Sequence, residues 1–148
     1  MTSPKESGTP GTITAGFWLV VAGMALVVLT PIYLYLNKQV LIDAQVQANT
    51  DPQFTPAEIQ SAVTVIIVTT LAVNLLLTAL AVFFAHRVRT GVRRSRTGLL
   101  ITLLIALFFQ LAVDNVLGLV PCLVAIAGLV LFYFRQSSDY LTESERAE

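Results

Sequence analysis

The sequence is poor in the residues that bind metals and carry redox chemistry. Its 148 residues include one cysteine, Cys122, and one histidine, His86. A single cysteine excludes an intrachain disulfide and a thiolate cluster for zinc or iron–sulfur, and a single histidine excludes a bis-histidine haem site. Paired Glu and His ligands, a glycine-rich phosphate loop, a nucleophile elbow and an HExxH motif are absent as well. We therefore expect no enzymatic activity, no cofactor and no bound metal.

Charge is equally scarce. Only 12% of the residues are charged, nine basic and nine acidic, whereas 55% are apolar. Soluble domains typically have about 25% charged residues. Four uncharged stretches stand out, at residues 15–36, 61–85, 97–113 and 116–134. Because a helix needs roughly 20 apolar residues to cross a bilayer, we predict an all-α polytopic membrane protein with a four-helix transmembrane domain over residues 15–134.

The two ends of the chain are polar. Residues 1–14 are rich in Ser, Thr, Pro and Gly and are typical of a disordered tail, and residues 135–148 form an acidic C-terminal tail. We interpret residues 15–36 as a retained span, because a signal peptide has an apolar region of only ~7–15 residues and more basic residues before it. Pro31 is expected to kink this helix or loosen its last turns.

Charge is distributed unevenly around the predicted spans. The loop after the second span is rich in arginine and free of acidic residues, whereas residues 37–60 are net acidic. Because Lys and Arg in short loops mark the cytoplasmic side, we predict that the arginine-rich loop is cytoplasmic and that residues 37–60 are extracytoplasmic. Four spans then place both termini in the cytoplasm and the protein in the cell (plasma) membrane. The loop arginines are Arg87, Arg89, Arg93, Arg94 and Arg96.

These five arginines are candidate contacts for anionic lipid headgroups. Docking of an acidic cytoplasmic partner is the alternative. Nucleic acid is not expected as a partner, because its bases are commonly stacked on aromatic side chains and no aromatic residue lies between Arg87 and Arg96.

Two short patterns predict where the chain starts a helix and where it turns. Thr55 and Glu58 flank a proline at the first helical position, so they predict an N-cap and a capping box at the start of the second long helix. Asp114 and Asn115 interrupt the last apolar region and predict a tight turn at the outer surface. The alternative role for Asp114 is to meet a cation or a neighbouring subunit.

Polar residues inside the spans are the places where a function could reside. Thr70, Asn74 and Thr78 recur every four residues and share one helix face, as do Thr102 and Gln110 in the next span. Counting residues inward from the outer ends places Asn74 level with glycines of the first and fourth spans, with Thr102 nearby as a hydrogen-bond partner. We interpret these residues as interhelical packing contacts.

Small residues form two stripes that allow helices to approach closely. Gly16 and Gly23 lie on one side of the first span, and Gly118, Ala125 and Gly128 lie in the fourth. Helix association in membranes relies on such close packing. The stripes either contact a partner subunit or pack against each other within the bundle.

The closing hairpin carries a resemblance to known proteins. Its sequence, RTGLLITLLIALFFQLAVDNVLGLVPCLVAIAGLVLFYFRQSSDYL, the Val/Ala/Leu/Thr-rich spans and the preference for Arg over Lys resemble small four-span membrane proteins of actinobacteria. The resemblance covers mainly the last 50 residues and is one of composition and style. It implies an accessory subunit of a larger membrane assembly, and respiratory-chain supercomplexes are among such assemblies.

The scarcity of catalytic groups and this resemblance together predict a non-catalytic accessory subunit of a larger membrane protein complex. Its expected partners are membrane lipids and larger integral membrane subunits. The alternative is a small oligomeric transporter or channel, with Asn74, Gln110 and Asp114 along its path.

Overall fold

The computed structural model describes residues 9–113 and 116–146, with side chains described as far as Glu143. These residues contain helices and no strand, so the predicted all-α fold class is confirmed for the described chain. The helices are α1 (Gly11–Leu36), α2 (Lys38–Ala48), α3 (Pro56–Arg89), α4 (Ser95–Ala112), α5 (Val116–Leu131) and α6 (Arg135–Arg146).

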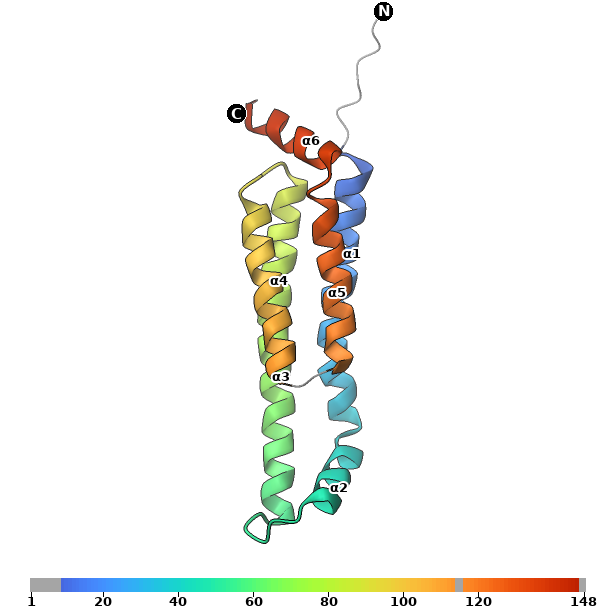
Figure 1. Ribbon diagram of the computed structural model, residues 1–148, viewed down its shortest axis with the longest axis vertical. Coiled ribbons are helices and arrows are strands. Elements are labelled where there is room, and N and C mark those ends of the chain that lie inside the picture. Colours follow the sequence, from blue (N-terminus) through green and yellow to red (C-terminus); the bar gives the residue numbers. More distant parts are fainter. Residues whose placement is uncertain (1–8, 114–115, 147–148) are drawn as a thin grey trace, which may run out of the picture.

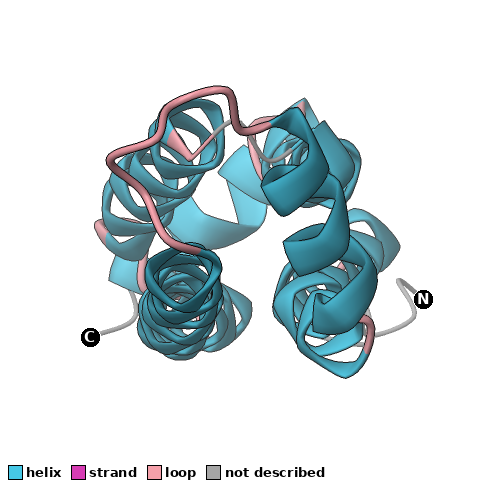
Figure 2. Ribbon diagram, turned by 90° about the horizontal axis from the view of Figure 1, so that it is seen from below, coloured by secondary structure: helices cyan, strands magenta, loops and turns pink. Residues whose placement is uncertain are grey.

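Four of the helices form an antiparallel bundle. α1 packs on α3 and α5, and α4 packs on the same two helices, so the four surround one core (Figures 1 and 2). The start of α1, the α3–α4 loop and α6 lie at one end of this bundle. A hydrogen bond of 2.9 Å between the hydroxyls of Thr12 and Ser137 joins α1 to α6 there. The two ends of the described chain are therefore on the same side.

The lengths and composition of the helices fit a multi-pass membrane protein. α1, α3 and α4 are each long and apolar enough to cross a bilayer, and α5 with α6 forms a fourth candidate span that is bent by 60°. Large apolar side chains are exposed on all four bundle helices, among them Trp18, Leu76, Phe108 and Leu123. The lipid tails of a bilayer would bury these surfaces, whereas in water such large apolar surfaces would be unfavourably exposed.

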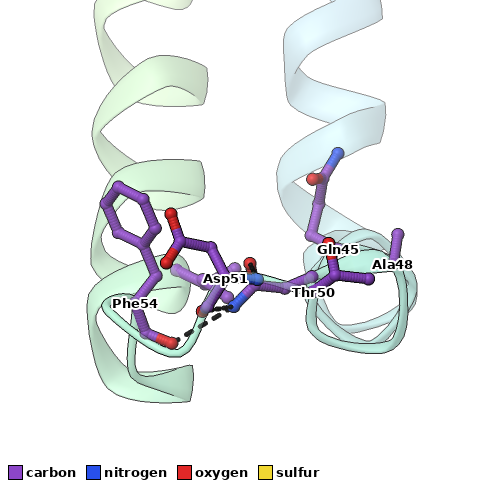
Figure 3. A pocket seen from close by; sticks show the side chains of 7 residues that line it. Gln45, Ala48, Thr50, Asp51 and Phe54 are labelled. Carbon is purple, nitrogen blue, oxygen red and sulfur yellow. Dashed lines mark hydrogen bonds between the residues drawn. The ribbon is translucent and has the colours of Figure 1, made fainter.

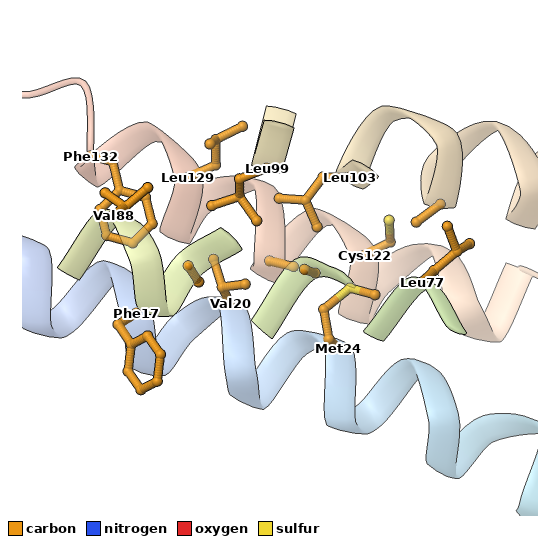
Figure 4. Close-up of a cluster of buried hydrophobic side chains, with 14 of the residues drawn as sticks. Phe17, Val20, Met24, Leu77, Val88, Leu99, Leu103, Cys122, Leu129 and Phe132 are labelled. Atoms are coloured by element: carbon orange, nitrogen blue, oxygen red, sulfur yellow. The ribbon is translucent and has the colours of Figure 1, made fainter. Parts of the chain in front are cut away.

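The core of the bundle consists of apolar side chains that point inward from every helix. Figure 4 shows this layer, which runs from Phe17 and Phe132 at the α6 end to Met24 and Leu77 further along the bundle. Cys122 lies inside it as a free, buried thiol. Since lipid tails are as apolar as this core, close packing rather than exclusion of water must hold the helices together.

Glycine allows α1 and α5 to pack most closely. A Cβ atom added to Gly16 would lie 2.8 Å from the carbonyl oxygen of Gly128, and one added to Gly23 would lie 2.6 Å from the nitrogen of Ala125. Gly118 is buried on α5 as well. The small-residue stripes therefore pack against each other inside the bundle, and their interpretation as a partner-facing surface is wrong.

The connection between the first two spans is largely helical. α1 continues as α2 after a break at Asn37, and α2 ends at Ala48. In the following turn the Asn49 side chain donates hydrogen bonds to the carbonyls of Asp51 and Phe54 (Figure 3). Helical structure therefore extends through α1 and α2 almost as far as this turn.

α3 begins with the predicted capping box. The Thr55 hydroxyl accepts a hydrogen bond from the Glu58 N–H, and the Glu58 carboxylate accepts one of 2.8 Å from the Thr55 N–H. The backbone and hydroxyl hydrogen bonds from Thr55 lower the pKa of the Glu58 carboxyl from its ordinary value. Because the pKa is lowered, this cap stabilises the helix start at neutral pH and is lost as the pH falls through the lowered pKa.

At its other end α3 turns into α4 through a glycine. Gly91 has a φ of 97°, which is a conformation that residues with side chains rarely adopt. The N–H of Val92 donates to the carbonyl of Arg87, and that of Gly91 to Val88, both at 3.0 Å. This is the Schellman pattern of a helix C-terminus, and it reverses the chain within a few residues.

Helices of unequal length give the molecule a projecting end. α3 has 34 residues, or about 51 Å, whereas α4 has 18 and α5 has 16, or about 27 Å and 24 Å. α2 and the first part of α3 therefore extend beyond the α4–α5 hairpin (Figure 1). The predicted turn residues Asp114 and Asn115 at the end of this hairpin lie outside the described residues.

The helix ends differ from the predicted boundaries by a few residues in the middle of the chain, where α3 ends at Arg89, and more clearly towards its two ends. Residues 11–14, which the sequence assigns to the N-terminal tail, form the first turn of α1. The predicted polar tail at residues 135–148 is helical over α6, after a turn at residues 132–134. The two segments contact each other through the hydrogen bond between the Thr12 and Ser137 hydroxyls.

We predict that Gly16→Leu destabilises the bundle itself. The new side chain would meet the Gly128 carbonyl and Phe132, and such overpacking typically costs about 1–3 kcal/mol. Thermal unfolding in detergent, followed by circular dichroism, should show a lower midpoint. Ala15→Leu, which adds a larger side chain at the neighbouring exposed position, should leave the midpoint nearly unchanged. Equal midpoints for the two variants would contradict the close contact between α1 and α5.

Candidate functional site

A polar cluster lies inside the bundle where α1, α3 and α4 meet. The Asn74 side chain on α3 donates to the carbonyl oxygen of Val27 on α1 at 3.2 Å. The Gln110 side chain on α4 donates to the Asn74 oxygen at 3.0 Å. Asn74 and Gln110 have no exposed surface. Two amides thus link three helices in a setting where water cannot replace a lost hydrogen bond.

Pro31 explains why Asn74 binds the carbonyl of Val27. In an α-helix the carbonyl of residue 27 accepts a hydrogen bond from the N–H of residue 31. Proline has no N–H, so Pro31, which lies inside α1, leaves the Val27 carbonyl without this partner. The Asn74 amide supplies the missing donor from the neighbouring helix.

The predicted partner of Asn74 is wrong, and so is its predicted depth. The Thr102 hydroxyl donates at 2.9 Å to the carbonyl of Gly98 in its own helix, whereas Asn74 is level with Val27 and Gln110. The count from the outer ends fails because it assumes that the helices end at the same depth, whereas α3 begins well beyond the end of α4 (Figure 1).

The other predicted polar residues of α3 also face the bundle. The Thr78 hydroxyl donates to the Met24 carbonyl on α1 at 3.3 Å, one turn from the Asn74 contact, and Thr70 is buried. In the described part of the chain, no buried side-chain nitrogen or oxygen lacks a hydrogen-bond partner. The cluster contains no group that titrates near neutral pH, so its chemistry is that of a hydrogen-bonded cross-link.

A second cluster lies at the end of the bundle that carries the arginines. Arg89 lies over the ring of Phe17 at 5.2 Å, and Arg87 lies over the ring of Phe83 at 5.4 Å. These are cation–π distances. The sequence between Arg87 and Arg96 contains no aromatic residue and so gives no sign of these contacts. Phe17 comes from α1, and Phe83 comes from the preceding turn of α3.

Arg96 differs from the other arginines because it is nine-tenths buried. Its guanidinium donates to the Phe132 carbonyl at 2.8 Å and to the Ser138 hydroxyl at 3.1 Å. The guanidinium also lies 4.5 Å from the centre of the Tyr133 ring. Arg96 therefore holds the bend between α5 and α6, a structural role beside the lipid contact that the sequence predicts for it.

The side chains of the described residues offer no candidate metal centre. No group of three or more His, Cys, Asp or Glu side chains among them is placed to hold a metal ion. Protein-family models, curated proteins and solved structures give no match to this chain.

We predict that Asn74 and Pro31 are energetically coupled. Asn74→Leu removes the donor to the Val27 carbonyl and should lower the stability of the bundle in detergent. In a Pro31→Ala background the new N–H of residue 31 can bond to that carbonyl. Asn74→Leu should then cost less, by about 0.6–1.7 kcal/mol, the range of interhelical hydrogen bonds in membranes.

A double-mutant cycle on unfolding free energies measures this coupling. Thr102→Val serves as the control, because Thr102 bonds within α4 and shares no partner with Pro31. Its effect should be the same in both backgrounds. A cost of Asn74→Leu that does not depend on residue 31 would show that the Val27 carbonyl is not the group that Asn74 satisfies.

Proposed function

We propose that the protein is a non-catalytic accessory subunit of a larger membrane protein complex. In this proposal the bundle crosses the plasma membrane four times, with both termini and the α3–α4 loop in the cytoplasm. The arginine content of the loop and the acidic character of residues 37–60 support this orientation. The start of α1 and α6 lie at the same end of the bundle, which is compatible with this orientation.

The observation that carries the proposal is the projecting end of the molecule. With the inner boundary of the bilayer at Ala85, the start of α3 at Pro56 lies about 44 Å away, whereas the hydrocarbon core is only ~30 Å thick. Phe54, with 57% of its surface exposed, then stands beyond the lipid tails. Val40 of α2, at the same projecting end, is also exposed, and exposed apolar surface outside the lipid tails favours contact with another protein.

A groove beside Phe54 adds to this surface. It lies between α2 and the first turns of α3, has a volume of about 500 Å³ and is lined by Gln45, Phe54, Ile59, Val63 and Ile66, among others. Apolar side chains with a few polar groups at the edge are typical of a protein contact. The apolar sides of the bundle offer further contact area at lipid depth.

The alternative function, a small oligomeric transporter or channel, has weaker support. The amides of Asn74 and Gln110, which would line its path, are engaged with each other and with the Val27 carbonyl. The resemblance of the closing hairpin to small actinobacterial membrane proteins makes a respiratory-chain assembly the first complex to test.

We predict that cysteines at Gln47 and Thr90 label from opposite sides of the membrane. Both positions are exposed, and the native Cys122 is buried in the bundle and can be replaced by Ala. An impermeant maleimide added to intact cells should label Gln47→Cys, whereas Thr90→Cys should react only after permeabilisation. Labelling of Thr90→Cys in intact cells would overturn the orientation.

We also predict that the protein co-purifies with larger membrane subunits in stoichiometric amounts. Affinity purification in a mild detergent, followed by mass spectrometry, should identify them. Phe54→Ala should release the partner while leaving the bundle folded, because Phe54 lies outside the bundle core. Gln47→Ala, an exposed change on α2 that does not line the groove, should retain the partner.

One result would count against this function, and another against the contact surface assigned to it. Recovery of the wild-type protein only as a monomer or homo-oligomer, under conditions that preserve other complexes of the same membrane, would contradict the accessory role. Retention of the partner by Phe54→Ala would show that the contact surface lies elsewhere.

A further inference from the structure

A cavity lined by arginines lies at the start of α4. Its walls are formed by Arg93, Arg94, Arg96, Thr97 and Tyr133, and its volume is about 480 Å³. The first four residues come from the α3–α4 loop and the first turn of α4, and Tyr133 comes from the bend between α5 and α6. The cavity therefore exists only because α4 and this bend lie side by side.

The walls of the cavity favour an anion. Arg93 and Arg94 are exposed, and a guanidinium presents donors in a fork that matches phosphate oxygens. The described contacts of Arg96 are a carbonyl, a hydroxyl and an aromatic ring. All three are neutral, so they leave the positive charge of Arg96 uncancelled. The partial positive charge of the α4 N-terminus adds to the same field.

The surroundings of the cavity indicate where the anion comes from. Tyr133 and its neighbour Phe134 are exposed aromatic residues, as is typical of the boundary between headgroups and lipid tails. One turn along α4 from Thr97, Ile101 is exposed, and exposed apolar side chains continue along the helix. A phosphate in the cavity would thus sit directly above a surface that acyl chains cover.

We propose that this cavity binds the phosphate of an anionic phospholipid from the leaflet that faces the arginines. Arg93 and Arg94 hold the phosphate from the loop, Thr97 offers a hydroxyl donor, and Arg96 adds charge from the buried side. Basic pockets between transmembrane helices bind anionic headgroups in this way. The proposal differs from a general attraction of arginines to the membrane, because it assigns the binding to the three arginines that line the cavity and leaves out Arg87 and Arg89.

The other loop arginines provide a matched control. Arg87 and Arg89 lie on the last turn of α3, over Phe83 and Phe17, and do not line the cavity. The double variants Arg93→Gln/Arg94→Gln and Arg87→Gln/Arg89→Gln each remove two positive charges from the same end of the bundle. A purely electrostatic attraction to the membrane would be weakened equally by both.

The test measures lipid binding to the purified full-length protein by native mass spectrometry. The probes are dioleoyl phosphatidylglycerol, dioleoyl phosphatidylcholine and inorganic phosphate. We expect the wild-type protein to prefer phosphatidylglycerol over phosphatidylcholine. Arg93→Gln/Arg94→Gln should weaken phosphatidylglycerol binding about tenfold or more, given the usual contribution of one basic residue near an anionic surface. Arg87→Gln/Arg89→Gln should leave it largely unchanged.

Three results would overturn the proposal. Equal losses in the two double variants would reduce the cavity to general surface charge. Unchanged phosphatidylglycerol binding in Arg93→Gln/Arg94→Gln would place the lipid elsewhere. Inorganic phosphate that binds as tightly as phosphatidylglycerol and displaces it would identify a free anion, not a lipid, as the ligand. Circular dichroism of each variant checks that the helices are intact, so that lost binding reflects the lost contacts.

Discussion

The structure depends on one carbonyl that cannot be left without a partner. Pro31 interrupts the hydrogen bonding of α1 inside a protein whose surroundings contain little water, and an unsatisfied polar group there is costly. Asn74 supplies the missing donor to Val27 and is itself held by Gln110. This chain of bonds sets the position of α3 along α1 and of α4 along α3. The backbone hydrogen bond that α1 lacks is thereby replaced by side-chain hydrogen bonds that connect three helices.

α5, the last helix of the bundle, is held in place by different contacts. α5 contacts α1 through Gly16, Gly23 and Gly128, where backbone meets backbone and no larger side chain fits. At the end of α5, Arg96 reaches from α4 to the Phe132 carbonyl and fixes the bend into α6. Van der Waals contact therefore holds the middle of this helix, and a charged hydrogen bond holds its end. Neither needs a hydrophobic driving force, which lipid does not supply.

This arrangement leaves the interior closed and places the features available to other molecules on the surface. The internal amides are engaged with protein groups, whereas Phe54 at the projecting end and the arginine cavity at the opposite end remain accessible. A candidate contact surface at each end of the bundle suits the proposed role between lipid and larger subunits. The unequal helix lengths create the first surface, and the α5–α6 bend creates the second.

The sequence by itself determined the features that depend on local chemistry. Long uncharged runs predict the helices, and Thr55 with Glu58 predicts the start of α3, because capping groups act within one turn. The partners of these helices were decided only in the tertiary structure. Asn74 bonds to Val27 and Gln110 rather than Thr102, and the glycine stripes face each other, because both depend on how far one helix slides along another. Because the helices end at different depths, their relative positions along the bundle differ from those that the sequence predicts. No local sequence pattern indicates these positions.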